Sequence, residues 1–585
     1  MSSSKRCKTA SKRDASQMLE CRSTRSQTRR KEANRVLEEK REMNTRMLIS
    51  KLPPEVLLIV FFILKDTCTL DAREKPDVHV LDWIRVTHVC HSWRELSLSA
   101  SKLWSYIRCT APSDLPWAIE MLHRSKQSPL SVRLDRLDPT TSPIETHKIA
   151  GLIDNLHRFR EVDLRNFGSR ALVRIMDQVM APLLHTLKID CPPSRLVTFC
   201  LSNRMLRTES LRKLSYVNCH VDPNSEFLHG LTHLGLRQAG TIEDILCILS
   251  QTANLEVADV GIFEPSEEGS DHLVVRSAKI HLPVLKTLRI CASTCDVATI
   301  LSNIVAPHVL RLRIFALEMG QRSPTENLVS ILRPLSAHFL VLEHGSVPKT
   351  TKPSPDYIRS MRLCISKADV LIVQAFKEAF SQEQLSENGM DPILDSTFSW
   401  GVNLDGDFQS RILKPLLDHL PLNNLVTLQL FIWCAMSGSA WSSTFGLLPN
   451  LESILVSGAL DILAFVGSLL PENPSTIPLK VSFPLLNSIT FYEFVCEPDT
   501  GEWMTPVLST ILKIFVARDF MGFPIKHLTL LGCPPLSDSQ LDICRLAVPD
   551  VQQLKDSIQV DIFRAYLTTV GRISSSNVEH FLDLP

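Results

Sequence analysis

Histidine, cysteine and carboxylate side chains are the residues of this sequence that could bind a metal or catalyse a reaction. The segment HVCHSW brings His88, Cys90 and His91 together, but no second ligand pair follows at the spacing of a zinc site. The sixteen cysteines are otherwise scattered, without a CxxC motif. We therefore expect no metal, and we interpret the cysteines as reduced, buried side chains of an intracellular protein.

Motifs that supply an active site are also missing from the sequence. It contains no GxxxxGK[ST] phosphate loop, no GxGxxG, no HExxH and no GxSxG elbow. Histidines and carboxylates are plentiful, yet none is clustered in a way that would separate a general acid from a general base. Only 20 glycines occur, which argues against an active site built from loops. We predict that the protein is not an enzyme and needs no cofactor.

Length and composition indicate a folded protein with more than one domain or a long repeat array. The chain has 585 residues, of which 44% are hydrophobic and 22% charged, the ordinary globular range. The longest apolar run, Val56 to Leu64, is far shorter than the roughly 20 residues that span a bilayer. We expect a soluble protein that does not bind a membrane.

Charge is unevenly distributed along the chain. Residues 1–46 carry 14 Lys or Arg and 6 Asp or Glu, a net charge of 14 − 6 = +8, so the remainder sums to −8. We predict a disordered basic arm there, although nucleic acid, an acidic partner or an import receptor could bind it. KRCKTASKR, from Lys5, could serve as an import signal, so a cytoplasmic or nuclear location, or both, stays open.

Residues 47–110 have the pattern of a small helical domain. In SKLPPEVLLIVFFIL, Pro53 and Pro54 suit the first turn of a helix, and Glu55 suits its positive end. This helix is apolar over most of its circumference, so it must be covered from more than one direction. A polar loop is predicted from Lys65 to Val80, followed by WIRVTHVCHSWREL and KLWSYI, whose tryptophans would anchor the packing.

A different regularity begins near residue 111, where segments of the form LxxLxL recur. Their middle positions are separated by 27, 20, 24, 30 and 24 residues, close to the period of about 20–29 residues of leucine-rich repeats. These anchors are Leu187, Leu214, Leu234, Ala258, Leu288 and Leu312. A second series, spaced by 26, 35 and 39 residues, consists of Leu428, Ile454, Ile489 and Leu528.

Amphipathic helices are predicted between the anchors, for example in ALVRIMDQVM, DVATILSNIV, ILAFVGSLL and LSTILKIFV. A strand–helix unit cannot bury its apolar face alone, so the units must stack into a curved α/β array. We divide the chain into a first half at 111–344, an irregular insertion or weak repeats at 345–410, a second half at 411–549 and a C-terminal tail at 550–585.

The sequence of motifs in residues 50–107 resembles an F-box, with LPPEVLLIVFFIL, then VCHSWREL, then KLW in the family's order. The resemblance implies a surface that docks on the Skp-type adaptor of a cullin ubiquitin ligase. The long predicted loop departs from the family's pattern, and a helical cap on the repeats is the alternative. The residues that would form or support the docking surface are Leu52, Pro53, Leu57, Ile59, Val60, Leu64, Val86, Val89, Cys90 and Trp93.

The strand–helix units resemble the degenerate leucine-rich repeats of long fungal F-box proteins, with Cys219 and Cys533 as remnants of the repeat turn. If the strands line the concave face, the residue after each anchor faces a groove. Four of these seven residues are basic, which suggests an acidic target segment, although a merely solvated face is the alternative. The seven are Arg165, Lys188, Ser215, Gly235, Asp259, Arg289 and Arg313.

The resemblance therefore predicts the substrate-recognition subunit of an SCF-type ligase. The module would bind the adaptor and the repeats an unknown target protein, without chemistry by this chain. The alternatives are an interaction scaffold outside any ligase and, less favoured, a nucleic-acid binder that uses the basic arm.

Overall fold

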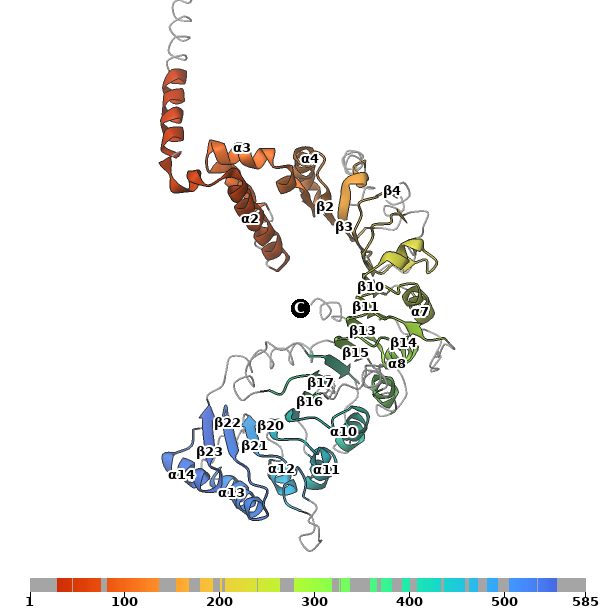
Figure 1. The fold of residues 1–585 in the computed structure, drawn as a ribbon, viewed down its shortest axis with the longest axis vertical. Coiled ribbons are helices and arrows are strands. Elements are labelled where there is room, and N and C mark those ends of the chain that lie inside the picture. Colours follow the sequence, from red (N-terminus) through yellow and green to blue (C-terminus); the bar gives the residue numbers. More distant parts are fainter. Residues whose placement is uncertain are drawn as a thin grey trace, which may run out of the picture. The chain divides into compact units, whose positions relative to one another are not determined.

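The computed structural model describes most of the chain between residues 29 and 554. The described ranges are 29–44, 46–74, 81–135, 154–167, 179–192, 200–201, 206–238, 240–262, 278–317, 326, 328–336, 358–365, 370–380, 392–399, 408–432, 436–457, 462–471, 481–492, 504–533 and 535–554. The chain forms two compact units, the first comprising residues 1–165 and 181–184, the second 166–180 and 185–585. The fold is mixed α/β, as predicted (Figure 1).

The first unit joins a group of helices to a short parallel sheet. Its helical elements are η1 (Leu48–Lys51), α2 (Pro54–Glu74), η2 (Asp82–His88), α3 (His91–Ser99), η3 (Ser101–Trp104), η4 (Pro112–Asp114), α4 (Leu115–Arg124) and η5 (Leu156–Arg158). Strands β1 (Tyr106–Cys109), β2 (Leu130–Asp135) and β3 (Phe159–Arg165) pair in parallel. The predicted boundary at residue 110 thus falls inside this unit.

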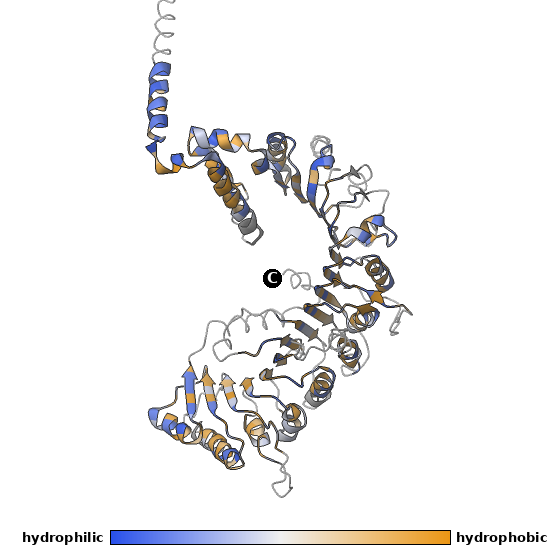
Figure 2. Cartoon of the chain, in the orientation of Figure 1, coloured by the Kyte–Doolittle hydropathy of each residue, from blue (hydrophilic) through white to orange (hydrophobic). Residues whose placement is uncertain are grey.

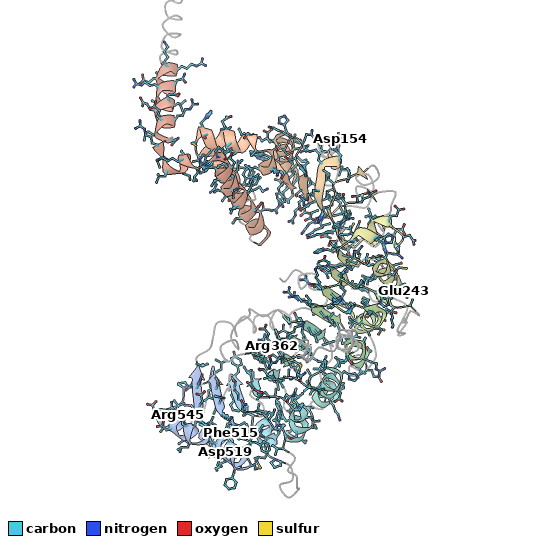
Figure 3. The ribbon with its side chains drawn as sticks, viewed as in Figure 1. Asp154, Glu243, Arg362, Phe515, Asp519 and Arg545 are labelled. Carbon is cyan, nitrogen blue, oxygen red and sulfur yellow. The ribbon has the colours of Figure 1, made fainter. Side chains whose placement is uncertain are left out.

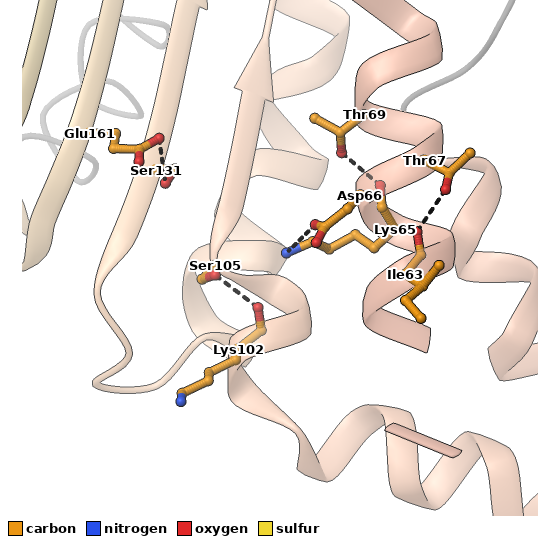
Figure 4. A network of polar contacts seen from close by, with 9 residues as sticks. All are labelled: Ile63, Lys65, Asp66, Thr67, Thr69, Lys102, Ser105, Ser131 and Glu161. Carbon is orange, nitrogen blue, oxygen red and sulfur yellow. Dashed lines mark hydrogen bonds and ion pairs between the residues drawn. The ribbon is translucent and has the colours of Figure 1, made fainter. Parts of the chain in front are cut away.

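Helix α2 is longer than expected, because it runs through much of the predicted loop from Lys65 to Val80. No glycine or proline interrupts the sequence before Pro76, so the helix can continue. The hydroxyls of Thr67 and Thr69 donate to the carbonyls of Ile63 and Lys65, at 2.9 and 2.8 Å (Figure 4). The loop prediction was therefore wrong up to Glu74, and residues 75–80 lie outside the described part.

The second unit is built on one large, mainly parallel sheet. From one edge to the other, its strands are β5 (Thr186–Asp190), β8 (Lys213–Val217), β10 (His233–Arg237), β11 (Val257–Gly261), β13 (Thr287–Ser293), β15 (Arg311–Leu317), β18 (Leu394–Ser399), β17 (Val370–Phe376), β16 (Ser360–Ile365), β19 (Thr427–Ile432), β20 (Ser453–Ser457), β21 (Ser488–Tyr492), β22 (His527–Leu531) and β23 (Asp550–Leu554). Strand β17 is antiparallel to both of its neighbours.

The region predicted as an insertion or weak repeats keeps this sheet continuous. Strands β16, β17 and β18 all lie between residues 345 and 410, and the order β15-β18-β17-β16-β19 joins the two halves. The segments GSVPKTTKPSPD and SQEQLSENGMDP, read as loops, lie almost wholly outside the described residues. The predicted tail from residue 550 begins with a strand instead, since β23 extends to Leu554.

The predicted anchors lie directly beside one another in neighbouring strands of the sheet. Leu187, Leu214, Leu234, Ala258, Leu288 and Leu312 are paired in consecutive strands, as are Leu428, Ile454, Ile489 and Leu528. All ten are buried. Because neighbouring residues of a strand face opposite sides of the sheet, one shared row places every anchor on the same, apolar face.

Helices cover that face of the second unit (Figure 1). They include α7 (Ile242–Ser250), α8 (Thr294–Asn303), α10 (Phe408–His419), α11 (Gly438–Ser443), α12 (Ile462–Ser468), α13 (Met504–Phe520) and α14 (Asp538–Ala547). Residues 328–336 are also helical. The helices predicted at DVATILSNIV, ILAFVGSLL and LSTILKIFV are confirmed. Only residues 179–180 of ALVRIMDQVM are described, and they form strand β4 (Val179–Met180).

Turns after the strands use the left-handed backbone conformation. Asn166 and Asn218 have φ of 59° and 56°, a region that asparagine tolerates better than most residues. The Asn218 backbone N–H donates to the Arg237 carbonyl at 2.9 Å, and its Nδ2 donates to the Cys191 carbonyl at 2.8 Å. The turn residue is thus asparagine at positions that the search for repeat remnants missed.

Candidate binding surfaces

A compact aromatic core fixes the orientation of α2 in the first unit. The ring of Phe61 lies 5.1 Å from that of Trp93, and the rings of Trp83 and Trp104 are also 5.1 Å apart. Trp104 donates from Nε1 to the Ser97 carbonyl at 2.8 Å and is fully buried. Leu57 and Phe61 are the buried residues among the described side chains of α2, so only one side of this helix packs into the core.

Next to this buried side, α2 carries an exposed apolar surface, which we call the α2 ridge. It shows as a hydrophobic helix in Figure 2. Its side chains follow the i, i+3, i+4, i+7, i+8 spacing of one helix face. The ridge consists of Val56 (40% exposed), Ile59 (57%), Val60 (46%), Ile63 (61%) and Leu64 (40%).

The predicted adaptor-binding residues divide between the surface and the core. Leu57 and Val86 are buried, so they can only support the surface, and Cys90 and Trp93 are half-buried. Cys90 also caps α3, because its Sγ accepts from the Trp93 backbone N–H at 3.5 Å. The exposed members are Leu52, Pro53, Ile59, Val60, Leu64 and Val89.

Two ridge residues, Val56 and Ile63, were missed by the sequence analysis. A helical period counted from Ile59 would have found both, since they lie three residues before it and four after it. The predicted set followed the resemblance to the F-box pattern and included neither residue. The exposed face of α2 is therefore larger than the predicted set.

In the second unit, a polar row crosses the sheet on the face opposite the anchors. The row runs through neighbouring strands in one register, from β5 to β19. Its members are Lys188, Ser215, Gly235, Asp259, Arg289, Arg313, Asp395, Gln374, Arg362 and Gln429. Lys188, Arg289 and Arg313, predicted as groove residues, are thus brought into one row.

Arg165, the remaining predicted groove residue, lies in the first unit. Its Nε is 3.1 Å from a carboxylate oxygen of Asp163, and Arg133 Nε lies 3.8 Å from the other oxygen of that carboxylate. The carboxylate therefore offsets part of the positive charge of both arginines. In the first unit's sheet, Arg165 of β3 pairs with Asp135 of β2.

Positive charge accumulates around Arg289. Burial lowers the pKa of its guanidinium, and the nearby charges of Arg313, Arg237 and Arg311 lower it further, whereas Asp259 raises it. Asp259 is already bound by Arg237, with 3.0 Å between Nη2 and Oδ2. Arg289 Nε is buried without a hydrogen-bond partner in the described part of the chain. We call these four arginines with Asp259 the arginine cluster.

A hydrogen-bonded network continues the row beyond the cluster. Arg362 donates to the side-chain oxygens of Gln429 and Gln374, at 2.7 and 3.3 Å, and Gln374 donates to Asp395 at 3.2 Å. Arg313 Nε lies 3.8 Å from Asp395. Burial raises the pKa of the Asp395 carboxyl, although the hydrogen bond from Gln374 and both arginines oppose this. The row therefore contains carboxylates as well as arginines and is not uniformly basic.

The described cysteines are free thiols, six of them buried and five half-buried, whereas Cys200 is exposed, contrary to the prediction that all are buried. Burial raises the pKa of the Cys109 and Cys364 thiols to about 12, so both stay protonated at neutral pH. Cys219 and Cys533, predicted at the repeat turns, follow β8 and β22 and donate through Sγ to the carbonyls of Val217 and Leu531. Across the described ranges, histidines, cysteines and carboxylates form no group of three that could hold a metal ion.

Part of the basic arm is helical, at residues 29–44, where every described side chain is exposed. Ion pairs within this helix join Arg35 to Glu32 and Glu39, at 3.5 and 3.6 Å, and Arg41 to Glu38 at 3.4 Å. These pairs neutralise some of the arm's positive charge. Residues 1–28, which include the possible import signal, lie outside the described part.

No protein-family model matches this sequence, and a search of curated proteins finds no similar one. Within the described residues, none of the helices combines the length and the apolar character that crossing a membrane requires.

Proposed function

We propose that the protein is the substrate-recognition subunit of an SCF-type cullin ubiquitin ligase. The F-box-like helices of the first unit would dock on a Skp-type adaptor, and through it on a cullin. The sheet of the second unit, with its leucine-rich-repeat-like strand spacing, would bind the target protein. The observation that carries the proposal is the α2 ridge, a contiguous apolar surface on a small unit whose own core is already filled.

The α2 ridge is larger than chance exposure of single side chains would produce. Isolated exposed apolar residues are common, but a full helix face of Val, Ile and Leu is typical of a binding surface. Fully burying such a side chain contributes about 1.5–3 kcal/mol. Since Ile59 and Ile63 are 57% and 61% exposed, each could add about 1–2 kcal/mol to the affinity for a partner.

The arginine cluster supports target binding by the second unit. Four guanidinium groups around one carboxylate leave an excess of positive charge in the arginine cluster, and Arg289 Nε is an unused donor. An acidic segment could supply the missing acceptors, since arginine pairs readily with carboxylates. The ligase function would then rest on proximity, because a bound target is held at high effective concentration near the ubiquitin carrier.

Adaptor binding tests the first half of the proposal. The purified protein and an Ile59→Asp, Ile63→Asp variant would be titrated with a purified Skp-type adaptor and cullin. We expect the variant to bind at least about 100-fold more weakly, because two charges would face an apolar partner. The matched control is Trp117→Asp, since Trp117 is 45% exposed on α4 of the same unit. No binding by the unmodified protein would favour the scaffold alternative.

Peptide binding tests the second half. Fluorescence anisotropy with a labelled glutamate-rich peptide should show binding that weakens as salt rises, and a lysine-rich peptide of equal length should not bind. The variant Arg289→Glu, Arg313→Glu should lose the glutamate-rich peptide. Arg545→Glu, a charge reversal of an exposed arginine on α14 outside the polar row, is the control. Unchanged binding by the double variant would exclude the cluster as the target site.

A further inference from the structure

Helix α13 carries an exposed surface that neither proposed binding role uses. Its exposed side chains include Lys513, Val516, Ala517 and Phe520, which follow the i, i+3, i+4, i+7 spacing of a single face. Phe520 is 95% exposed, an extreme value for a large aromatic residue. We call these four residues the α13 stripe. An exposed phenylalanine at the end of such a stripe indicates a contact with another molecule.

A shallow cavity adjoins the α13 stripe. It has a volume of about 500 Å³ and is lined by Leu470 and Pro471, just after α12, together with the stripe itself. Its walls are almost wholly apolar. Phe520 thus lies beside a cavity that could receive an aromatic ring. The exposed ring and the cavity are on the same surface, so the ring of one copy could enter the cavity of another.

We infer that the α13 stripe is a self-association surface, on which two copies of the chain pack their α13 helices antiparallel about a two-fold axis. The spacing i, i+3, i+4, i+7 is unchanged when the direction of the helix is reversed. Each residue of the stripe therefore has a stripe residue of the antiparallel copy opposite it. Lys513 then faces Phe520 of the partner subunit. Val516 faces the partner's Ala517. Such a patch is self-complementary, which a two-fold interface requires.

Charge favours this orientation over others. Lys513 lies at one end of the stripe, and the exposed Asp519, labelled in Figure 3, flanks the stripe at its other end, next to Phe520. Neither side chain forms an ion pair with another described residue. The antiparallel arrangement brings each lysine near the partner's acidic end and over an aromatic ring, a favourable cation–π geometry. A parallel arrangement would place the two lysines together and oppose association.

Sedimentation equilibrium of the full-length protein tests the inference. We expect a reversible monomer–dimer equilibrium, with Phe520→Ser weakening dimerisation at least about tenfold. Lys513→Asp alone, or Asp519→Lys alone, should also weaken it, whereas the double exchange should recover most of the loss. Leu546→Ser is the control, because Leu546 is 87% exposed on α14 but lies outside the stripe.

Three outcomes would overturn the inference. They are a protein that stays monomeric at every concentration, a dimer that is insensitive to Phe520→Ser, and a double exchange no better than the worse single change. Circular dichroism would verify that every variant is folded, which the exposure of Lys513, Asp519 and Phe520 leads us to expect. The measurement needs neither adaptor nor target, so it is independent of the proposed function.

Discussion

Arg518 offers the sharpest test of how the second unit is held together. Its side chain is fully buried on the inner side of α13, and no described carboxylate accompanies it. Nη1 donates to the carbonyls of Leu469 and Ser482, at 2.8 and 3.0 Å, and Nη2 donates to the carbonyl of Phe483. Phe483 has a φ of 55°, so the arginine binds a backbone segment in an unfavourable conformation.

The cost of removing the guanidinium follows from opposing contributions. Hydrogen bonds to a charged group contribute about 1.5–3 kcal/mol each, so three of them contribute about 4.5–9 kcal/mol. Burial lowers the pKa of Arg518 to about 10, which corresponds to roughly 3 kcal/mol of lost solvation. Arg518→Met should therefore cost about 3 kcal/mol within a range of about 1.5–6 kcal/mol, because three carbonyls lose their donor.

Hydrogen exchange measured by mass spectrometry resolves this effect locally, which matters because two units need not unfold together. A loss of about 3 kcal/mol predicts roughly 100-fold faster exchange of the α13 amides. Arg518→Lys should fall between, since one ammonium cannot reach all three carbonyls. Arg545→Met is the control, because Arg545, labelled in Figure 3, is exposed and pairs with Asp542 at 3.0 Å. Unchanged exchange in Arg518→Met would refute the reasoning.

Two further predictions concern a turn and a buried carboxyl. Asn218→Val should destabilise the β8–β10 region by about 2–3 kcal/mol, because a β-branched residue tolerates the positive φ of position 218 poorly and the hydrogen bond to the Cys191 carbonyl is lost. Asn218→Gly should destabilise it less, because glycine adopts this φ readily. Hydrogen exchange of the β8 and β10 amides measures both effects. Asp395 has a raised pKa in the folded protein, so above the ordinary aspartate pKa the folded state binds the extra proton. Its contribution to stability therefore falls as pH rises through the window between the unfolded and folded pKa. Urea titrations at several pH values should show this slope reduced in Asp395→Asn, and an identical slope would contradict the assignment.

The anchors of the second unit could be predicted because register partners in neighbouring strands must all face the same side of the sheet. Each strand must place one leucine-like residue on the helix-covered face, and the residues on either side of it must face away. Leu214, Leu234 and Leu288 met this demand without any knowledge of the partner strand. The polar row followed automatically, since Ser215, Gly235 and Arg289 come directly after them.

Strand order and helix length could not be predicted in the same way. Strand β17 is apolar on both faces, as Val370, Leu371, Ile372 and Val373 are all buried, so no alternation marks its direction. The extension of α2 depends on Thr67 and Thr69, which are weak helix formers that the sequence analysis assigned to a loop. Here the helix outlasts its apolar run, because nothing in the sequence stops it before Pro76.

The division of α2 into core and surface is the hardest part to obtain from sequence. Phe61 is buried against Trp93, whereas Ile63, two residues later, is 61% exposed, yet both are large apolar residues in one uninterrupted run. Composition alone cannot separate a face that packs inside the unit from one that awaits a partner. What separates them is the volume of the unit itself: once Phe61, Trp83 and Trp104 fill the small core, no described element remains to cover the ridge. An apolar run longer than its own domain can bury therefore favours a binding surface, and the exposed apolar area limits how much burial can contribute to the affinity for a partner.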